Sequence, residues 1–209
     1  MTASTTATAI TDPFAASEAH AAIHAAAIET VGAAIGDQLV ETAVFRGETT
    51  LVVRRDRIVE ILALLRDHAD LRFDRLSDLT AIDYLDLGRE TRFNVVYHLM
   101  SRSSLARLRV RALVPDDDLI IASVVGMFPS ANWPEREVYD LFGIHFDGHP
   151  DLKRILLPDD WDGHPLRKDY PIGAEEIQFS FNQAEIAEQY PHTLEEREER
   201  YFVAHPLNN

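Results

Sequence analysis

Residues 133–171 hold most of the side chains in this sequence that could do chemistry (WPEREVYDLFGIHFDGHPDLKRILLPDDWDGHPLRKDYP). Imidazole and carboxylate groups follow the spacing H-x-x-x-H-x-D there, which suits Zn²⁺ and a metal-dependent hydrolase. Gly148 and Pro150 interrupt any helix that would bring both imidazoles to one face, and no glycine-rich oxyanion element accompanies them. A stand-alone metal-dependent hydrolase is therefore an alternative and not the main prediction. Its candidate ligands are His145, His149 and Asp151, with Asp140 or His164 nearby.

Two of these histidines have a simpler structural role available. His149 and His164 each stand between a glycine and a proline. Glycine supplies a flexible φ and proline fixes it, so the pattern predicts two similar turns. In each turn we expect the histidine to hydrogen-bond a backbone carbonyl and lock the chain. A proton relay through the two histidines is the alternative.

A short helix must position the first half of this segment. We expect Asn132 to cap it, Glu135 three positions later to complete a capping box, and Gly143 to end it. Arg136 and Asp140 are four residues apart, so they are expected to pair on one face of the helix.

Prolines at 150, 158, 165 and 171 forbid a long helix after Gly143 and disfavour a central strand. Residues 144–171 are therefore predicted to run as an extended strap punctuated by turns. Apolar anchors are distributed along it: Phe146, Leu152, Ile155, Leu156, Leu157, Trp161 and Tyr170.

Hydrophobic periodicity predicts alternating helices and strands upstream of this segment. The predicted strands are a hairpin of 38–46 with 49–54, then 77–86, 92–100 and 105–114. The first predicted helix starts at Asp12-Pro13 or at Ser17 and runs to about Ile35. The other predicted helices are 57–68, with Asp56 as cap, and one that begins at Asp116-Asp117-Asp118 and ends at Pro129. This order predicts an α+β, two-layer domain: a mixed five-stranded sheet, helices on one face, and an extended C-terminal strap.

Two side-chain patterns in this body allow a functional and a structural interpretation. His20 and His24 are four apart and could bind a metal, but no third ligand is fixed nearby, so we expect two surface histidines. An arginine stripe on strand 105–114 is expected to be a solvated face paired to carboxylates, with an acidic partner or a phosphate as the alternative. The stripe consists of Arg107, Arg109 and Arg111.

The chain of 209 residues is long enough for one domain with an appended tail. We predict a flexible N-terminus over 1–15, the α+β domain over 16–143, and a partner-binding strap with an acidic tail over 144–209.

Composition excludes several classes of function. The formal net charge of −15 disfavours nucleic acid and anionic membrane surfaces as direct partners. No run of eighteen apolar residues is present, so no membrane span is predicted. The absence of cysteine excludes disulfides and a thiolate-ligated iron–sulfur cluster in this chain. No G-x-G-x-x-G or P-loop pattern is present, and the N-terminus lacks the basic residues of a targeting peptide, which favours a bacterial cytoplasmic protein.

The motif-rich segment resembles a known family. Glu135-Arg136-Glu137, then Asp140-Leu141-Phe142, His149 and Lys153-Arg154-Ile155 are similar to the signature of the 30 kDa subunit family of bacterial NADH:quinone oxidoreductase, respiratory complex I. The stretch from Gly163 to Pro171 (GHPLRKDYP) also resembles that family. The resemblance covers about forty contiguous residues.

The resemblance implies a scaffolding subunit without autonomous activity and without a cofactor of its own. FMN and iron–sulfur clusters would lie in partner subunits, and electrons would pass from NADH to quinone through them. The chain would pack against the hydrogenase-like quinone-site subunit and the subunit with the terminal cluster. It would lie at the cytoplasmic side of the bacterial inner membrane as a peripheral protein. The equivalent subunit of a membrane-bound hydrogenase or deazaflavin dehydrogenase is the alternative within the superfamily.

An extended segment rich in aromatic and basic residues also has the composition of a permanent interface. Both lysines of the chain, Lys153 and Lys168, lie in it, each beside an arginine. No catalytic, cofactor-binding or metal-binding residue is predicted. The predicted partner-binding residues are Glu135, Arg136, Glu137, Asp140, His149, Lys153, Arg154, Trp161, His164, Arg167, Lys168, Asp169 and Tyr170.

Overall fold

The structure is a computed structural model that describes residues 18–170 except 86 and 90. The predictions for the N-terminal 1–15 and for the acidic tail after 171 lie outside the described residues. Backbone contacts place the described residues in one compact unit.

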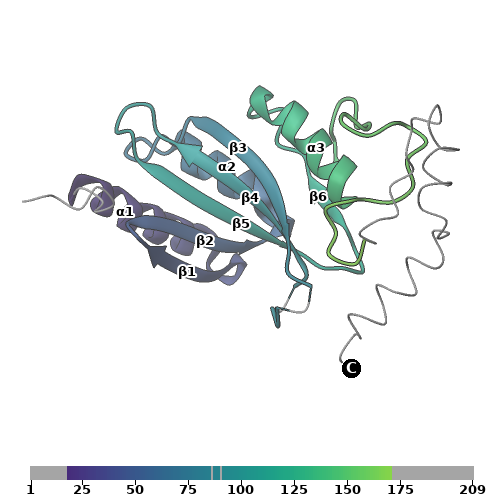
Figure 1. Cartoon of the computed structure of the whole chain (residues 1–209). Helices are drawn as coiled ribbons and strands as arrows, with labels where there is room; N and C mark the ends of the chain where they lie inside the picture. The colour runs from purple at the N-terminus through teal and green to yellow at the C-terminus, as the bar shows by residue number, and fades with distance from the viewer. Residues whose placement is uncertain (1–17, 86, 90, 171–209) are drawn as a thin grey trace, which may run out of the picture. The chain divides into compact units, whose positions relative to one another are not determined.

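A mixed five-stranded sheet is the centre of this unit, as predicted (Figure 1). The strand order is β1-β2-β5-β4-β3, in which β2 and β5 run parallel and every other neighbouring pair is antiparallel. The two strands of the predicted hairpin turn at Arg46 and Gly47, both of which have a positive φ. The strands are β1 (Leu39–Phe45), β2 (Glu48–Arg54), β3 (Arg75–Asp83), β4 (Phe93–Met100) and β5 (Arg107–Val114).

The helices lie against one face of the sheet, and none of the described helices covers the other face, called the open face below. Figure 1 shows α1 and α2 behind the sheet and α3 alongside β3. Short 3-10 turns, η1 (Gly36–Gln38), η2 (Arg55–Arg57) and η3 (Pro129–Ala131), precede β1, α2 and α3. The helices are α1 (Glu18–Ile35), α2 (Ile58–Asp67) and α3 (Asn132–Phe142). No helix in the described part of the chain is both long enough and apolar enough to cross a bilayer.

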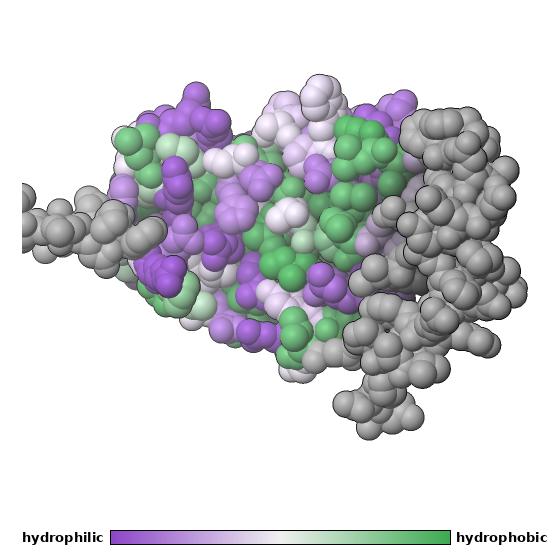
Figure 2. All heavy atoms as spheres, viewed as in Figure 1, coloured by the Kyte–Doolittle hydropathy of each residue, from purple (hydrophilic) through white to green (hydrophobic). Residues whose placement is uncertain are grey.

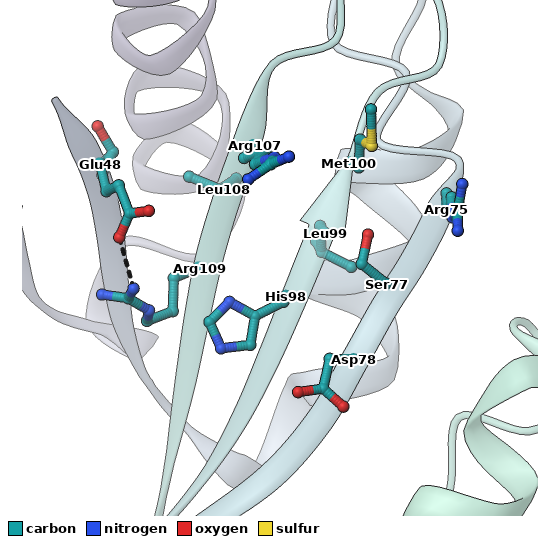
Figure 3. A pocket seen from close by; sticks show the side chains of 11 residues that line it. Glu48, Arg75, Ser77, Asp78, His98, Leu99, Met100, Arg107, Leu108 and Arg109 are labelled. Atoms are coloured by element: carbon teal, nitrogen blue, oxygen red, sulfur yellow. Dashed lines mark hydrogen bonds and ion pairs between the residues drawn. The ribbon is translucent and has the colours of Figure 1, made fainter. Parts of the chain in front are cut away.

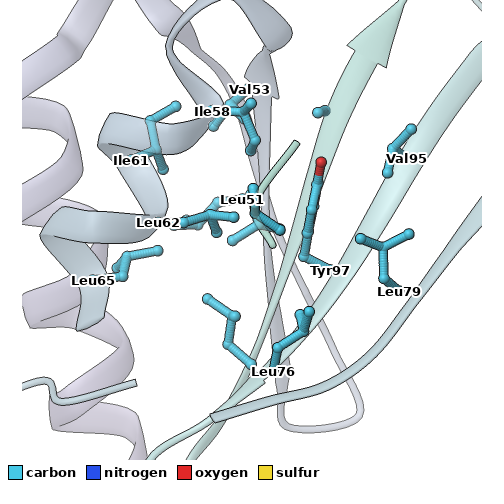
Figure 4. Packing of buried hydrophobic residues seen from close by; sticks show 14 of the residues in the cluster. Leu51, Val53, Ile58, Ile61, Leu62, Leu65, Leu76, Leu79, Val95 and Tyr97 are labelled. Carbon is cyan, nitrogen blue, oxygen red and sulfur yellow. The ribbon is translucent and has the colours of Figure 1, made fainter. Parts of the chain in front are cut away.

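The core fills the layer between sheet and helices, because alternate residues of each strand point to the same face. Its members come from the predicted apolar stripe of α2 and from the central strands (Figure 4). Tyr97 lies fully buried in this layer opposite α2. The labelled α2 members are Ile58, Ile61, Leu62 and Leu65.

The helix predicted after Asp118 is wrong. This stretch instead contains a short strand, β6 (Ile120–Ala122), followed by turns up to η3. β6 pairs in parallel with β7 (His145–Asp147), the first segment after α3. The apolar spacing of the stretch suits one face of a helix. The stretch forms a strand instead because β7, twenty-five residues further along, supplies its hydrogen bonds, and the local sequence pattern does not reveal that partner.

Two predicted helix caps are also wrong. α3 begins at Asn132 itself, and neither its N-cap residue, Ala131, nor the N-cap of α2 makes a side-chain capping bond. Asp56, the predicted cap of α2, lies inside η2. The predicted end of α3 is confirmed, because Gly143 takes a left-handed conformation with φ 74°.

His24 corrects the expectation of two surface histidines on α1. Its side chain is buried, and its Nε2 lies 2.7 Å from the carbonyl oxygen of Arg107. His20 Nε2 lies 2.9 Å from the carbonyl oxygen of Ser104. These two contacts attach α1 to the start of β5. The four-residue spacing of the two histidines therefore places both rings on the side of α1 that packs against this strand.

Candidate partner-binding site

Residues 144–170, called the strap below, fold back onto α3, and Asp140 is the centre of that contact. The Asp140 carboxylate is completely buried. One oxygen accepts a hydrogen bond from Arg154 Nη1 at 2.8 Å, and the other accepts three consecutive backbone N–H groups at 2.8–3.0 Å. Burial alone raises the pKa of this carboxyl, but these donors outweigh it and hold the pKa of Asp140 below its usual range. The N–H groups belong to Ile155, Leu156 and Leu157.

The predicted pair between Arg136 and Asp140 is therefore wrong. Asp140 faces Arg154 instead, and Arg136 donates to the carbonyl oxygens of Lys153 and Arg154 at 3.0 and 2.8 Å. Arg154 also donates to the carbonyl oxygens of Trp161 and Gly163. Through these backbone carbonyls, Arg136 joins α3 to the strap, and Arg154 joins one turn of the strap to the next.

Both predicted histidine turns form as expected. His149 Nε2 lies 3.0 Å from the carbonyl oxygen of Asn132, while its Nδ1 accepts the N–H of Asp151 at 3.0 Å. His164 Nδ1 lies 2.8 Å from the carbonyl oxygen of Asp140. Burial lowers the pKa of His164, and the bond to the Asp140 carbonyl opposes that shift in part. The two rings fasten the strap to the two ends of α3.

The hydrolase alternative loses its central ligand in this arrangement. Both ring nitrogens of His149 are engaged by protein groups, so neither has a lone pair available for a metal without breaking a turn. Within residues 18–170, apart from 86 and 90, no group of three or more His, Cys, Asp or Glu side chains is arranged to hold a metal ion.

The end of the strap is attached to the sheet by an ion cluster that the sequence interpretation missed. Arg92 donates to both oxygens of the buried Asp83 at 3.0 Å and to Asp169 at 2.6 Å. Asp83 also accepts the backbone N–H of Lys168 at 2.8 Å. Although burial opposes it, this set of donors keeps the pKa of Asp83 below its usual range. The sequence did contain a signal for this pair, because Asp83 and Arg92 have opposite charges and stand at the two ends of the β3–β4 loop.

Arg167 and His164 both approach the backbone of Gly143 closely. Arg167 donates to the carbonyl oxygen of Phe142 at 2.7 Å, and its guanidinium lies 5.6 Å from the centre of the Phe93 ring. A Cβ at Gly143 would lie 2.5 Å from Arg167 and His164 side-chain atoms. The glycine therefore serves two purposes, the left-handed end of α3 and the close approach of the strap.

Glu135, predicted as a capping-box residue, is buried and attaches α3 to the turn after β6. It accepts the N–H of Val124 at 2.8 Å and the hydroxyl of Ser123 at 2.6 Å. Burial raises its pKa to about 7, which these two donors reduce only in part. The adjacent core residue Tyr97 has a pKa raised by burial and by the charge of Glu135.

The structure thus brings the predicted site residues together, mainly through contacts within the chain. Trp161 is half-buried, Tyr170 donates to the carbonyl oxygen of Asp162, and Lys153 pairs with Asp151 at 2.7 Å. Glu137 and Lys168 have exposed side chains. Binding of these residues to another subunit stays a prediction.

Two large apolar side chains near α3 are exposed: Leu156, which the sequence predicted as an apolar anchor of the strap, and Trp133, which it did not single out. Trp133 is 71% exposed and Leu156 is 62% exposed. Together with Pro129, Pro134 and Ile155 they line a groove of about 490 Å³. On the face drawn in Figure 2, hydrophobic residues gather over the strap beside α3. Trp133 does not share the helical spacing of the buried Val138 and Phe142. This spacing could have predicted from the sequence that Trp133 lies outside the buried face of the helix.

The arginine stripe of β5 is only partly paired on the open face of the sheet (Figure 3). Arg109 pairs with Glu48 at 2.6 Å, as expected for a solvated face. The Arg111 guanidinium instead lies 5.2 Å from the centre of the Tyr84 ring. Arg107 makes no side-chain hydrogen bond or ion pair within the described residues.

Comparison with known proteins identifies the family. The family described as respiratory-chain NADH dehydrogenase, 30 Kd subunit, matches residues 51–176, and the chain belongs to it. A relative from Roseiflexus sp. (strain RS-1), named as the C subunit of NADH-quinone oxidoreductase, is 46% identical over 172 residues, which cover 82% of this chain and 98% of the relative. One of the same name from Citrifermentans bemidjiense is 52% identical over 134 residues, which cover 64% of this chain and 81% of the relative.

A solved structure shares the fold at lower identity. It is a chain of a membrane-bound sulfane sulfur reductase, an archaeal respiratory membrane complex, with a TM-score of 0.58 and 23% identity. The match covers 78% of this chain and 88% of that chain. The predicted α+β class and the family resemblance are both confirmed by these comparisons and by the sheet described above.

Proposed function

We propose that this chain is the 30 kDa-family subunit of a proton-translocating NADH:quinone oxidoreductase and acts in it as a scaffold without chemistry of its own. The observation that carries this is the 46% identity to the Roseiflexus relative over nearly that protein's whole length. Electrons would pass from NADH through FMN and iron–sulfur clusters in partner subunits to quinone. The chain would hold the hydrogenase-like quinone-site subunit and the terminal-cluster subunit in place, at the cytoplasmic side of the bacterial inner membrane.

The contacts at α3 support a scaffolding role. The groups of the motif that could titrate or act as nucleophiles, such as Asp140 and His149, are used to fix the strap. A fixed strap presents its outer side chains in one geometry, which lowers the entropic cost of binding a partner. The strap would then hold the cofactor-bearing subunits in fixed positions, because its own surface is already fixed before they bind.

The test is purification of the tagged chain from native membranes in mild detergent, followed by identification of the associated subunits. We expect flavin-binding, NADH-binding and quinone-site subunits to co-purify, together with NADH:quinone activity. Association with hydrogenase or deazaflavin-linked subunits would instead support the equivalent subunit of those complexes. Recovery of the chain only as an active free monomer would contradict the scaffold.

A variant separates scaffolding from catalysis. Arg136→Ala removes two hydrogen bonds from α3 to the strap, so we expect less assembled complex at unchanged KM for NADH. Arg66→Ala on α2 is the matched control, because in the described part of the chain this arginine pairs only with the neighbouring Asp67. An altered KM at normal assembly would overturn the scaffolding role.

A further inference from the structure

Three hollows at the surface of the described unit adjoin one another at shared lining residues, and together they are called the trough below. The groove at Trp133 and Leu156 shares Pro129 and Ser130 with a hollow beside Arg102 and Phe128. That hollow shares Arg75 with the depression on the open face of the sheet. The trough therefore runs from the start of α3, past the first residue of β3, onto the open sheet face. A row of adjoining hollows of this kind suits an extended polypeptide better than a compact small molecule.

The two ends of the trough differ in chemistry. At the α3 end the exposed side chains are apolar, and Trp133 and Leu156 are the most exposed of them. At the sheet end Arg75, Met100 and Arg107 lie side by side across β3, β4 and β5, in register (Figure 3). Both arginines are exposed, and neither makes a side-chain hydrogen bond or ion pair within residues 18–170, apart from 86 and 90.

Unpaired arginines are informative in a chain with a formal net charge of −15. The other arginines of the trough have carboxylate partners: Arg109 with Glu48 and Arg102 with Asp74. Arg75 and Arg107 thus remain as the two cations that a ligand could neutralise. Guanidinium groups favour carboxylates, which they bind in a planar, bidentate geometry.

We propose that the trough binds one extended segment of a partner subunit, with an apolar side chain between Trp133 and Leu156 and an acidic residue at Arg75 and Arg107. The inference rests on the proposed function, because it names the chemistry of the partner that the scaffold holds. The apolar end supplies buried area and the arginine end fixes direction along the trough, since a reversed segment would place its carboxylate on apolar side chains.

Site-specific photo-crosslinking in the assembled complex tests the path. The probe p-benzoylphenylalanine is placed at Leu156 and, separately, at Met100, which leaves both arginines intact. Phe45, 70% exposed on the edge strand β1, is the control position. We expect the first two probes to label one continuous segment of the same partner chain, with an Asp or Glu nearest the Met100 adduct, and the Phe45 probe to miss that segment.

The outcomes separate the two proposals. If the complex co-purifies but the two probes label different chains, distant segments, lipid alone or nothing, the trough is not the binding path and the scaffold still stands. If the unmodified tagged chain does not co-purify with other subunits, both proposals fail.

Charge reversal tests the arginine end independently. Arg75→Glu with Arg107→Glu is expected to lower the fraction of chain in the assembled complex by about tenfold, because like charges then meet. Arg54→Glu, on β2 at the opposite end of the same sheet face, is the matched control and should leave assembly unchanged. Thermal unfolding of each variant checks that the fold is retained. Equal assembly of both variants, or equal loss, would overturn the assignment.

Discussion

The Asp140 carboxylate and the Arg154 guanidinium meet at 2.8 Å across the junction of α3 and the strap, fourteen residues apart in sequence. Asp140 is fully buried and the Arg154 side chain is 16% exposed. A buried ion pair contributes specificity of geometry more reliably than net stability, but loss of one partner leaves an uncompensated charge. This pair therefore determines where the strap lies, and its disruption is expected to be severe.

Asp140→Asn keeps the shape of the side chain and removes its charge. The amide must direct its NH₂ group either at Arg154 or at the three N–H donors of the strap, so at least one set of bonds is lost. We expect the free energy of unfolding to fall by about 3 kcal/mol. Urea unfolding of the purified chain measures this. Asp159→Asn, at an exposed position of the same strap, should change it by less than about 0.5 kcal/mol.

Gly143→Ala tests the close approach of the strap to the end of α3. The alanine Cβ would meet Arg167 and His164 atoms at 2.5 Å and would impose a side chain on a residue with φ 74°. We expect a loss of about 2 kcal/mol in the free energy of unfolding. Gly126→Ala is the control, because its Cβ would meet nothing within 4 Å. A Gly143→Ala chain as stable as the Gly126→Ala chain would contradict the described contact.

Glu135 predicts a pH dependence of defined sign. Its pKa is raised by burial to about 7 in the folded chain, above the usual 4.5, so the native state binds the proton more tightly than the unfolded state. Its contribution to stability is therefore fully present below about pH 4.5 and is lost as pH rises through about 7. Glu135→Gln removes this dependence and should be the more stable protein at pH 8, by about 1–3 kcal/mol.

The measurement is the difference in unfolding free energy between wild type and Glu135→Gln, from denaturant titrations at pH 5, 6, 7 and 8. A difference is needed because burial lowers the pKa of His24, His98 and His164, and these groups contribute the opposite slope. A difference that does not change between pH 5 and 8 would show that Glu135 titrates normally.

His149 is expected to be a structural histidine. His149→Ala removes the bonds to the Asn132 carbonyl and the Asp151 N–H, at a cost of about 1–2 kcal/mol in the free energy of unfolding. Calorimetric titration with Zn²⁺ should give the same result for wild type and for this variant. His145→Ala, which replaces an exposed ring, is the control for stability. A stoichiometric zinc site that disappears in both variants would restore the hydrolase alternative.

Local periodicity was sufficient to predict the five strands and α2, because each has an apolar face of the right period. It failed at residues 119–128, where the partner of β6 lies beyond α3 and a short apolar run fits either element. The stop at Gly143 and the prolines after it located the end of α3 and the strap, but not the contacts between them. Local pairing rules assigned Asp140 to Arg136 and Glu135 to a cap, whereas both carboxylates bind donors eleven or more residues away.

The parallel pairing of β2 with β5 has a consequence for the nascent chain. Thr49 lies opposite Leu108, so the hairpin of β1 and β2 joins the sheet only after 59 further residues have been made. At roughly 5–20 residues per second, the ribosome needs about 3–12 s for that interval. During it the hairpin's inner edge, which later pairs with β5, stays open to other strands, so rapid translation of this stretch or a chaperone at the exit tunnel would protect the protein from aggregation.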